Sequence, residues 1–381
     1  MVSPVTQTPA GAFDPATCPR LVVKIGSSLL VDGSGSVRTD WLAGVVADIA
    51  ERRAAGQQVV IVSSGAIALG ARRLGLEKGG RASLEDAQAA AAVGQVALAG
   101  VWETLLAAQG LTAAQVLLTL GDLEDRRRYL NVAATIARLL DLGAVPVLNE
   151  NDTVATTEIR FGDNDRLAAR AAQAAGASGV ILLSDVDGLY TANPATDPTA
   201  QRLSVVKSLT SDIMAMATGE TRSGMGSGGM AAKLLAARMA GAAGIALAIC
   251  DGRVARPLSH FAQAGGGTLF LPPRAARGRK AWLAGRITVA GTLVVDAGAA
   301  AAIKRGASLL AAGVRSVDGK FRRGDVVAIV GPASELLGRG LAGYDADDAR
   351  AILGQRNEAQ GAILGYAPRA ALVHADHLVM L

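Results

Sequence analysis

Short apolar runs recur through the first two thirds of the chain and alternate with longer alanine-rich stretches. The runs are strand-length and mostly apolar, and they cover residues 21–25, 58–63, 144–149, 179–184 and 244–250. Such runs are typical of strands buried on both faces, as in a parallel sheet covered by helices. The longer stretches predict helices over residues 40–55 and 84–109, the second capped by Ser83. The alternation therefore predicts an α/β fold in which helices sandwich a mostly parallel sheet.

The last part of the chain differs in charge. Residues 277–381 hold 14 basic and 9 acidic residues and carry the whole net charge of +5, whereas residues 1–276 are neutral overall. Residues 264–282 (AGGGTLFLPPRAARGRKAW) combine glycines, prolines and basic residues in the manner of a linker. We therefore predict a first domain over residues 20–276 and a second over 277–381. Residues 1–19 are predicted to be a disordered extension.

Composition excludes several classes of protein. No uncharged apolar run reaches the ~20 residues of a membrane span, and the first residues lack the pattern of a signal peptide. Two cysteines, Cys18 and Cys250, cannot build a disulfide framework or a thiolate metal site. His374 and His377 stand without further ligands nearby in the sequence, so we assign no metal site to the protein's side chains. We predict a soluble, cytoplasmic protein with no membrane partner.

Polar residues gather where the predicted strands end. They are Lys24, Ser63 with Ser64, NEND at 149–152, and Ser184 with Asp185, joined by GDND at 162–165 and by the glycine-rich loop SGMGSGGMAAK at 223–233. In open α/β sheets, ligands bind beyond the carboxyl ends of the strands. Lysines, glycine amides and carboxylates that converge on one edge favour phosphoryl transfer, where catalysis is mostly positioning and charge neutralisation.

Each of these segments also has a purely structural interpretation. The G-x-G-x-x-G pattern at 224–229 is weak alone, and a dinucleotide site would need a strand before it, which IMAMATGETRS does not resemble. Lys24 could extend along the sheet to reach solvent. Ser63 and Ser64 could cap a helix that begins near Ala66. NEND and GDND could serve as turns and caps. Taken singly, the segments leave these alternatives open.

Their joint occurrence carries a resemblance to a known family. The ordered segments are VVKIGSS, IVSSGAIALG, AAVGQ, PVLNENDTVAT, FGDNDRLAA, LLSDVDGLYTANP and GMGSGGMAAKLLAA. In this order they resemble the glutamate 5-kinases of the amino-acid kinase family, from about residue 20 to 260. The later DAGAAAAI, GASLL and GAILGY resemble the small β-rich PUA domain appended to many bacterial members. The resemblance implies the amino-acid kinase fold followed by a PUA domain.

The same resemblance implies a reaction and a role for each matching residue. The reaction is the ATP-dependent phosphorylation of the side-chain carboxylate of L-glutamate, with Mg²⁺ bridging phosphates, which is the first step of proline biosynthesis. The catalytic positions are Lys24, Lys233 and Asp165. The ATP-binding positions are Lys24, Ser184, Asp185, Ser227, Gly228, Gly229, Met230, Ala231, Ala232 and Lys233. The contacts to L-glutamate are Ser64, Asp152 and Asn164.

Partners follow from the resemblance as well. It implies a homo-oligomer, feedback inhibition by proline, and hand-off of the product to glutamyl phosphate reductase. Two alternatives stay open: an amino-acid kinase with another acceptor, and an RNA-binding protein whose kinase domain is secondary. The second would use the basic PUA domain, although only Trp282, Phe321, Tyr344 and Tyr366 supply aromatic rings there. These are few for a surface that stacks bases.

Overall fold

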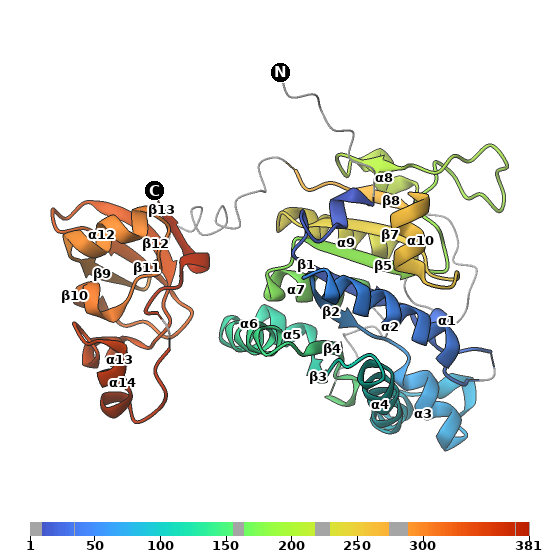
Figure 1. Cartoon of the computed structure of the whole chain (residues 1–381), viewed down its shortest axis with the longest axis horizontal. Coiled ribbons are helices and arrows are strands. Elements are labelled where there is room, and N and C mark those ends of the chain that lie inside the picture. Colours follow the sequence, from blue (N-terminus) through green and yellow to red (C-terminus); the bar gives the residue numbers. More distant parts are fainter. Residues whose placement is uncertain are drawn as a thin grey trace. The chain divides into compact units, whose positions relative to one another are not determined.

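The chain forms two compact units, Met1–Arg277 and Gly278–Leu381 (Figure 1). The computed structural model describes residues 10–33, 35–154, 164–217, 229–273, 289–369 and 371–380. Unit 1 is an α/β domain, and unit 2 is a smaller domain built around its own sheet.

An eight-stranded sheet organises unit 1. Its spatial order is β3-β4-β2-β1-β5-β7-β8-β6, and every neighbouring pair is parallel except β7 with β8. The strands are β1 (Arg20–Ile25), β2 (Gln58–Val62), β3 (Ala113–Leu118), β4 (Val145–Glu150), β5 (Gly179–Ser184), β6 (Val205–Val206), β7 (Ala246–Asp251) and β8 (Thr268–Phe270). The five apolar runs of the sequence thus form β1, β2, β4, β5 and β7, the centre of the sheet, which confirms the predicted fold class.

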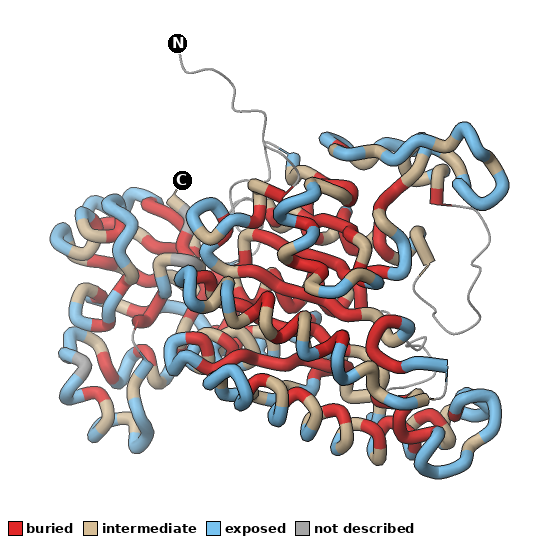
Figure 2. Tube along the Cα trace, turned by 45° about the vertical axis from the view of Figure 1, so that its right-hand side comes forward, coloured by how far each residue is buried: buried red, intermediate tan, exposed pale blue. Residues whose placement is uncertain are grey.

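Helices cover both faces of this sheet. They are α1 (Ser27–Leu30), α2 (Thr39–Ala54), α3 (Ala66–Leu74), α4 (Leu84–Ala107), α5 (Leu120–Glu124), α6 (Arg126–Asp141), α7 (Asn164–Ala175), α8 (Ser211–Ala215), α9 (Met230–Ala242) and α10 (Pro257–Ala264). Residues of α2, α4 and α10 share one buried cluster with the sheet, and residues of α6, α7 and α9 share another. Figure 2 shows the central strands as buried segments between partly exposed helices.

Strand alternation decides which face each side chain reaches. In β1, Leu21, Val23 and Ile25 belong to the cluster with α2 and α4, whereas Val22 belongs to the cluster with α7 and α9. Successive side chains of a strand point to opposite faces, so Lys24 follows Val22 toward α7 and α9. By the same rule, successive side chains at the ends of β2 and β4 point alternately toward the two helical layers.

Helices α3 and α4 are in unusually close contact. A Cβ added to Gly70 would collide with the carbonyl oxygen of Ala90, and one added to Gly94 would collide with that of Ala66. Two glycines therefore allow the backbones of the two helices to touch. Helix α4 begins as predicted, because the Ser83 side chain accepts a hydrogen bond of 3.0 Å from the Asp86 amide.

By length and composition alone, α4 is the one described helix that could also cross a membrane. Its inward residues argue for a different role in this fold. Leu98, Trp102 and Leu106 are buried in the same cluster as the central strands. We therefore assign α4 to the core of unit 1.

Two predicted segments are corrected by the structure. Residues 10–19 were expected to be part of a disordered extension, but they include a 3-10 turn, Gly11–Phe13, whose Phe13 ring is fully buried near Phe261. Burial of this ring removes apolar surface from water, which stabilises a segment whose composition alone predicts disorder. The expected linker over 264–282 also begins too early, since Thr268–Phe270 forms β8 beside β7.

Unit 2 is built around a five-stranded sheet in the order β10-β9-β11-β12-β13. Its elements are β9 (Gly291–Val295), α12 (Ala297–Lys304), β10 (Val314–Gly319), β11 (Val326–Val330), β12 (Leu336–Leu341), α13 (Ala346–Ala351), α14 (Asn357–Leu364) and β13 (Leu378–Met380). Its buried residues form a separate hydrophobic cluster. This part of the chain is β-rich, as predicted.

Candidate active site

Two lysines meet on one aspartate at the carboxyl edge of the sheet. Lys24 Nζ lies 2.7 Å from Asp165 Oδ1, and Lys233 Nζ lies 3.0 Å from Asp165 Oδ2. All three residues are buried, with at most 7 % of their surface exposed. They come from the end of β1, the first turn of α7 and the first turn of α9. The structure therefore brings together the three residues that the sequence predicted as catalytic.

The charges of this cluster do not cancel. Burial opposes the ionisation of Asp165, but the attraction of Lys24 and Lys233 outweighs it and holds the pKa of this carboxyl below its usual range. One carboxylate then faces two ammonium groups. Two positive charges and one negative charge therefore meet among these three buried side chains, an arrangement that suits an anion such as a phosphoryl group.

The neighbouring residue, Asn164, is held by a network of neutral groups. Its Nδ2 donates to the Ser63 carbonyl at 2.9 Å, to Ser64 Oγ at 2.7 Å and to Asn149 Oδ1 at 3.3 Å. Because a backbone carbonyl can only accept, the first bond fixes which end of the amide faces β2. Asn164 Oδ1 is left buried, with no hydrogen-bond partner among the described residues. Such an acceptor is available to a donor on a ligand.

The serines at the end of β2 do not cap α3. Helix α3 starts after Gly65, and no side chain caps its first turn. The Ser63 hydroxyl accepts a hydrogen bond of 3.0 Å from Trp102 Nε1 of α4, and the Ser64 hydroxyl accepts from Asn164. The capping interpretation of these serines is therefore wrong, because both hydroxyls are engaged elsewhere.

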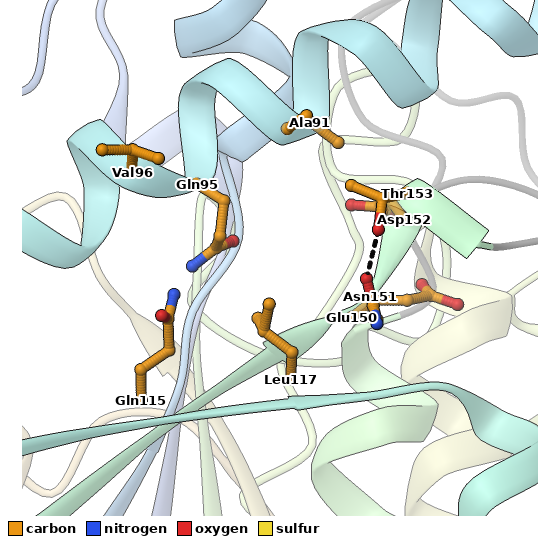
Figure 3. Close-up of a pocket in the computed structure, with 10 residues that line it drawn as sticks. Ala91, Gln95, Val96, Gln115, Leu117, Glu150, Asn151, Asp152 and Thr153 are labelled. Atoms are coloured by element: carbon orange, nitrogen blue, oxygen red, sulfur yellow. Dashed lines mark hydrogen bonds between the residues drawn. The ribbon is translucent and has the colours of Figure 1, made fainter.

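Asp152 lies at the rim of a cavity of about 310 Å³. The cavity is lined by residues of α4, β3 and the end of β4: Ala91, Ala92, Gln95, Val96, Gln115, Leu117, Glu150, Asn151, Asp152 and Thr153. Figure 3 shows Gln95 and Gln115 on one side of it and Asp152 with Thr153 on the other. Burial raises the pKa of Asp152 to about 6, an effect that Arg81 partly offsets. Asp152 does not line the lysine cluster, so the predicted substrate residues span two adjoining regions.

The predicted nucleotide residues lie on the other side of β1. Ser184 ends β5, and its hydroxyl donates to Asp185 Oδ1 at 3.1 Å. Gly229 is the residue before α9, and Met230, Ala231 and Ala232 form its first turn ahead of Lys233. The N-cap residue, Gly229, has no side chain with which to cap this helix, and the first amides of a helix have no acceptor within the helix itself. Ser227 and Gly228 lie outside the described residues.

The described residues do not provide a cage for a metal ion. Within them, no group of three or more histidine, cysteine, aspartate or glutamate side chains is placed to hold one. Both oxygens of Asp165 already face lysines. This donor set does not suit a metal held by the protein alone, whereas Mg²⁺ commonly binds through substrate phosphates and water.

Sequence reasoning missed three side chains of this region. The sequence places Asn149 in NEND and Gln95 in AAVGQ without indicating a role for either, and Trp102 lies outside every motif. In the structure Asn149 Nδ2 donates to Gln95 Oε1 at 2.7 Å, and Trp102 donates to Ser63. Gln95 and Trp102 are seven residues apart, which is two turns of one helix face. That spacing is the signal that could have identified them.

Comparison with known proteins agrees with this geometry. The profile of the Amino acid kinase family matches residues 19–251, and that of the PUA domain matches residues 291–359. The glutamate 5-kinase of Sphingopyxis alaskensis is 64% identical over 97% of this chain and 99% of its own length. Those of Novosphingobium aromaticivorans and Zymomonas mobilis are 62% and 58% identical, over 96% and 97% of this chain and 97% and 93% of theirs. The chain therefore belongs to the amino acid kinase family and, within it, to the glutamate 5-kinases that carry a C-terminal PUA domain.

Proposed function

We propose that this protein transfers the γ-phosphoryl group of ATP to the side-chain carboxylate of L-glutamate. The products are ADP and L-glutamyl 5-phosphate, and the reaction is the first step of proline biosynthesis in the cytoplasm. The observation that carries the proposal is the pair of buried lysines on Asp165. Its support from related proteins is the high identity to glutamate 5-kinases over nearly the whole chain.

The lysines act on the charge of the transferring group. A carboxylate oxygen of glutamate forms a bond to the γ-phosphorus while the bond between that phosphorus and the β,γ-bridging oxygen breaks. Lys24 and Lys233 approach from two different elements and neutralise the phosphoryl oxygens, while Asp165 keeps both ammonium groups in place. The attacking carboxylate is ionised at neutral pH, so the reaction needs no general base.

Glutamate is held by the neutral network and by Asp152. The buried Asn164 Oδ1 and the carboxylate of Asp152 are the acceptors for the substrate ammonium, and the Ser64 hydroxyl contacts the remainder of the molecule. Because the Asn164 amide nitrogen is already engaged, its oxygen has a fixed direction. This arrangement recognises an amino acid by placing acceptors at fixed points.

ATP is the second substrate and arrives as its magnesium complex. Ser184 ends β5, which lies on the side of β1 away from β2 and β4, and the first amides of α9, from Met230 onward, precede Lys233 in the same helix. Helix N-termini favour phosphate oxygens because their amides have no partner within the helix. The ion supplies further charge neutralisation on the phosphates.

The test is the acceptor range of the purified protein. With ATP, magnesium and hydroxylamine, an acyl phosphate is trapped as a hydroxamate, so a panel of carboxylic amino acids identifies the acceptor directly. We expect hydroxamate with L-glutamate and far less with L-aspartate, whose side chain is one methylene shorter, a difference worth roughly 10- to 200-fold in a fitted pocket. Equal turnover of the two acids, or none with glutamate, would contradict the proposal.

A further inference from the structure

We propose that Gln95 is a positioning residue for the amino-acid substrate, acting through Asn149 on Asn164. The inference rests on the proposed function, because it concerns how that function's glutamate site is held. Gln95 lies on α4, outside every segment whose residues are assigned to ATP, glutamate or phosphoryl transfer. It is joined to Asn164 by two successive side-chain hydrogen bonds.

Backbone groups fix the directions of the side-chain amides of Asn149 and Asn164. The Glu150 amide donates to Asn149 Oδ1 at 2.9 Å, so the oxygen of Asn149 must face that amide. Asn149 Nδ2 is thereby turned toward α4, where Gln95 Oε1 accepts from it at 2.7 Å. The Ser63 carbonyl fixes Asn164 in the same manner. Contacts with the main chain therefore set the orientation of the hydrogen bonds that run from Gln95 through Asn149 to Asn164.

Asn149 depends on Gln95 because it is buried. Only 3% of its surface is exposed, so a nitrogen that lost its acceptor would remain away from water. An unsatisfied buried amide is costly, and the side chain would move to find another partner. Its weakest contact is the one to Asn164, at 3.3 Å, compared with 2.7 Å to Gln95 and 2.9 Å from the Glu150 amide. A change at Gln95 is thus transmitted first to Asn164.

Helix α4 is a suitable support because it cannot shift easily. The residue before Gln95 is Gly94, whose α-carbon lies against the backbone of α3 at Ala66. Seven residues later, Trp102 donates to Ser63, whose carbonyl holds Asn164. One face of α4 therefore supports Asn164 by two routes, through Asn149 at the end of β4 and through Ser63 after β2.

The oxygen of Gln95 acts through Asn149 in this arrangement. Its oxygen is used by Asn149, and its side chain borders the cavity together with Gln115 of β3 (Figure 3). Gln115 is a matched reference, because it is the same residue type on the same cavity but belongs to the exposed edge strand. The structure shows no bond between Gln115 and Asn149.

The experiment compares Gln95→Met with Gln95→Glu and Gln115→Met in the full-length protein. Methionine keeps the length of the side chain and removes the acceptor, whereas glutamate keeps an acceptor oxygen. Steady-state kinetics should show that Gln95→Met raises the glutamate KM about 5- to 10-fold, the size of one lost hydrogen bond, with kcat and the ATP KM within about twofold of the parent. Gln95→Glu should keep the glutamate KM within about twofold of the parent, and Gln115→Met should leave all constants unchanged.

The outcomes separate this inference from the proposed function. If the parent protein does not phosphorylate glutamate, the proposed function fails, whatever the variants do. If the parent is active and Gln95→Met leaves the glutamate KM unchanged, the positioning role is wrong and the function stands. An equal rise in the KM of both substrates, or a Gln95→Glu variant as impaired as Gln95→Met, would also overturn the positioning role. Thermal unfolding of each variant, measured alongside, shows whether a kinetic change accompanies a loss of folding.

Discussion

The two faces of the sheet reach the same edge with different chemistry. Toward α7 and α9, β1 presents Lys24 to a cluster of ionised groups around Asp165. Toward α4, β2 and β4 present Ser63 and Asn149, which take part in a network of hydroxyls and amides. The first face concentrates charge and the second fixes direction, so one sheet edge separates the transfer of a charged group from the recognition of its acceptor.

The free-energy cost of burying a charge explains why charged and neutral groups lie on different faces of the sheet. Buried charges are tolerated only when they are paired, and Asp165 has two partners within 3.0 Å. A neutral amide avoids that cost and has donor and acceptor ends that define an orientation. Asn164 and Asp165 are consecutive in α7, yet they belong to different networks. The first turn of α7 is where the two kinds of chemistry meet.

The largest expected effect comes from removing charge on the ionised face. Lys24→Ala or Lys233→Ala should lower kcat by about 10²–10³ or more, because a charge that stabilises the transition state is lost. Steady-state kinetics on folded protein measures this, with circular dichroism as the folding control. Turnover close to normal in Lys233→Ala would show that the α9 lysine does not act on the phosphoryl group. Phosphoryl transfer could then not be assigned to the ionised face.

The next effect sharpens the comparison on the recognition face. Asp152→Asn should raise the glutamate KM by about 10- to 100-fold, since a charge-assisted hydrogen bond to the substrate ammonium is lost. The ATP KM should change little, because Asp152 lies at the cavity beside α4 and away from the lysines. Titration of both substrates measures the two constants. A similar change in both would mean that Asp152 is not a glutamate contact.

A smaller, reversible effect is expected from pH. Burial raises the pKa of Asp152 to about 6, so below that pH the free protein holds this carboxyl protonated and neutral. Only the ionised form attracts the ammonium group, and the glutamate KM should therefore rise as pH falls through about 6, approaching tenfold per pH unit below it. The profile of kcat/KM for glutamate tests this. The same profile in Asp152→Asn should lack that inflection, and an inflection that persists there would assign it to another group.

The smallest effect is expected from removing unit 2. All residues assigned to substrates or catalysis lie in unit 1, and the two units have separate hydrophobic clusters. A protein that ends near residue 276 should fold and phosphorylate glutamate with kcat within about tenfold of the full chain. Kinetics after circular dichroism would measure this. A folded but inactive fragment would show that unit 2 completes the site.

Much of the ionised face could be predicted from the sequence, but of the neutral face only Ser64 and Asn164 were named, without the side chains that hold them. Lys24, Asp165 and Lys233 stand in motifs at strand and helix ends, where convergence follows from the topology of parallel strands. Gln95 and Trp102 are ordinary residues of an alanine-rich helix, and their partners became visible only when the register of α4 against β2 and β4 was known. Side-chain pairs across layers depend on packing that no local pattern encodes.

Local propensity also misled where tertiary partners compete for the same atoms. A serine before a helix usually caps it, and Ser64 stands two residues before α3. Its hydroxyl is taken by Asn164, one hundred residues away in the chain. Phe13 likewise stands in a segment predicted to be disordered, yet its ring packs near Phe261, which is distant in the sequence. In both cases a long-range partner replaced the expected local role.

The glycine contact between α3 and α4 has a consequence for efforts to change the acceptor by directed evolution. Neither Gly70 nor Gly94 leaves room for a Cβ atom against the opposing backbone. Libraries that randomise either position should therefore return almost only glycine among active clones. The α4 side chains Ala92 and Val96, which line the cavity, are not confined in this way. A change of acceptor should consequently be sought by varying the cavity-lining side chains of α4, while Gly70 and Gly94 at the contact between α3 and α4 are kept.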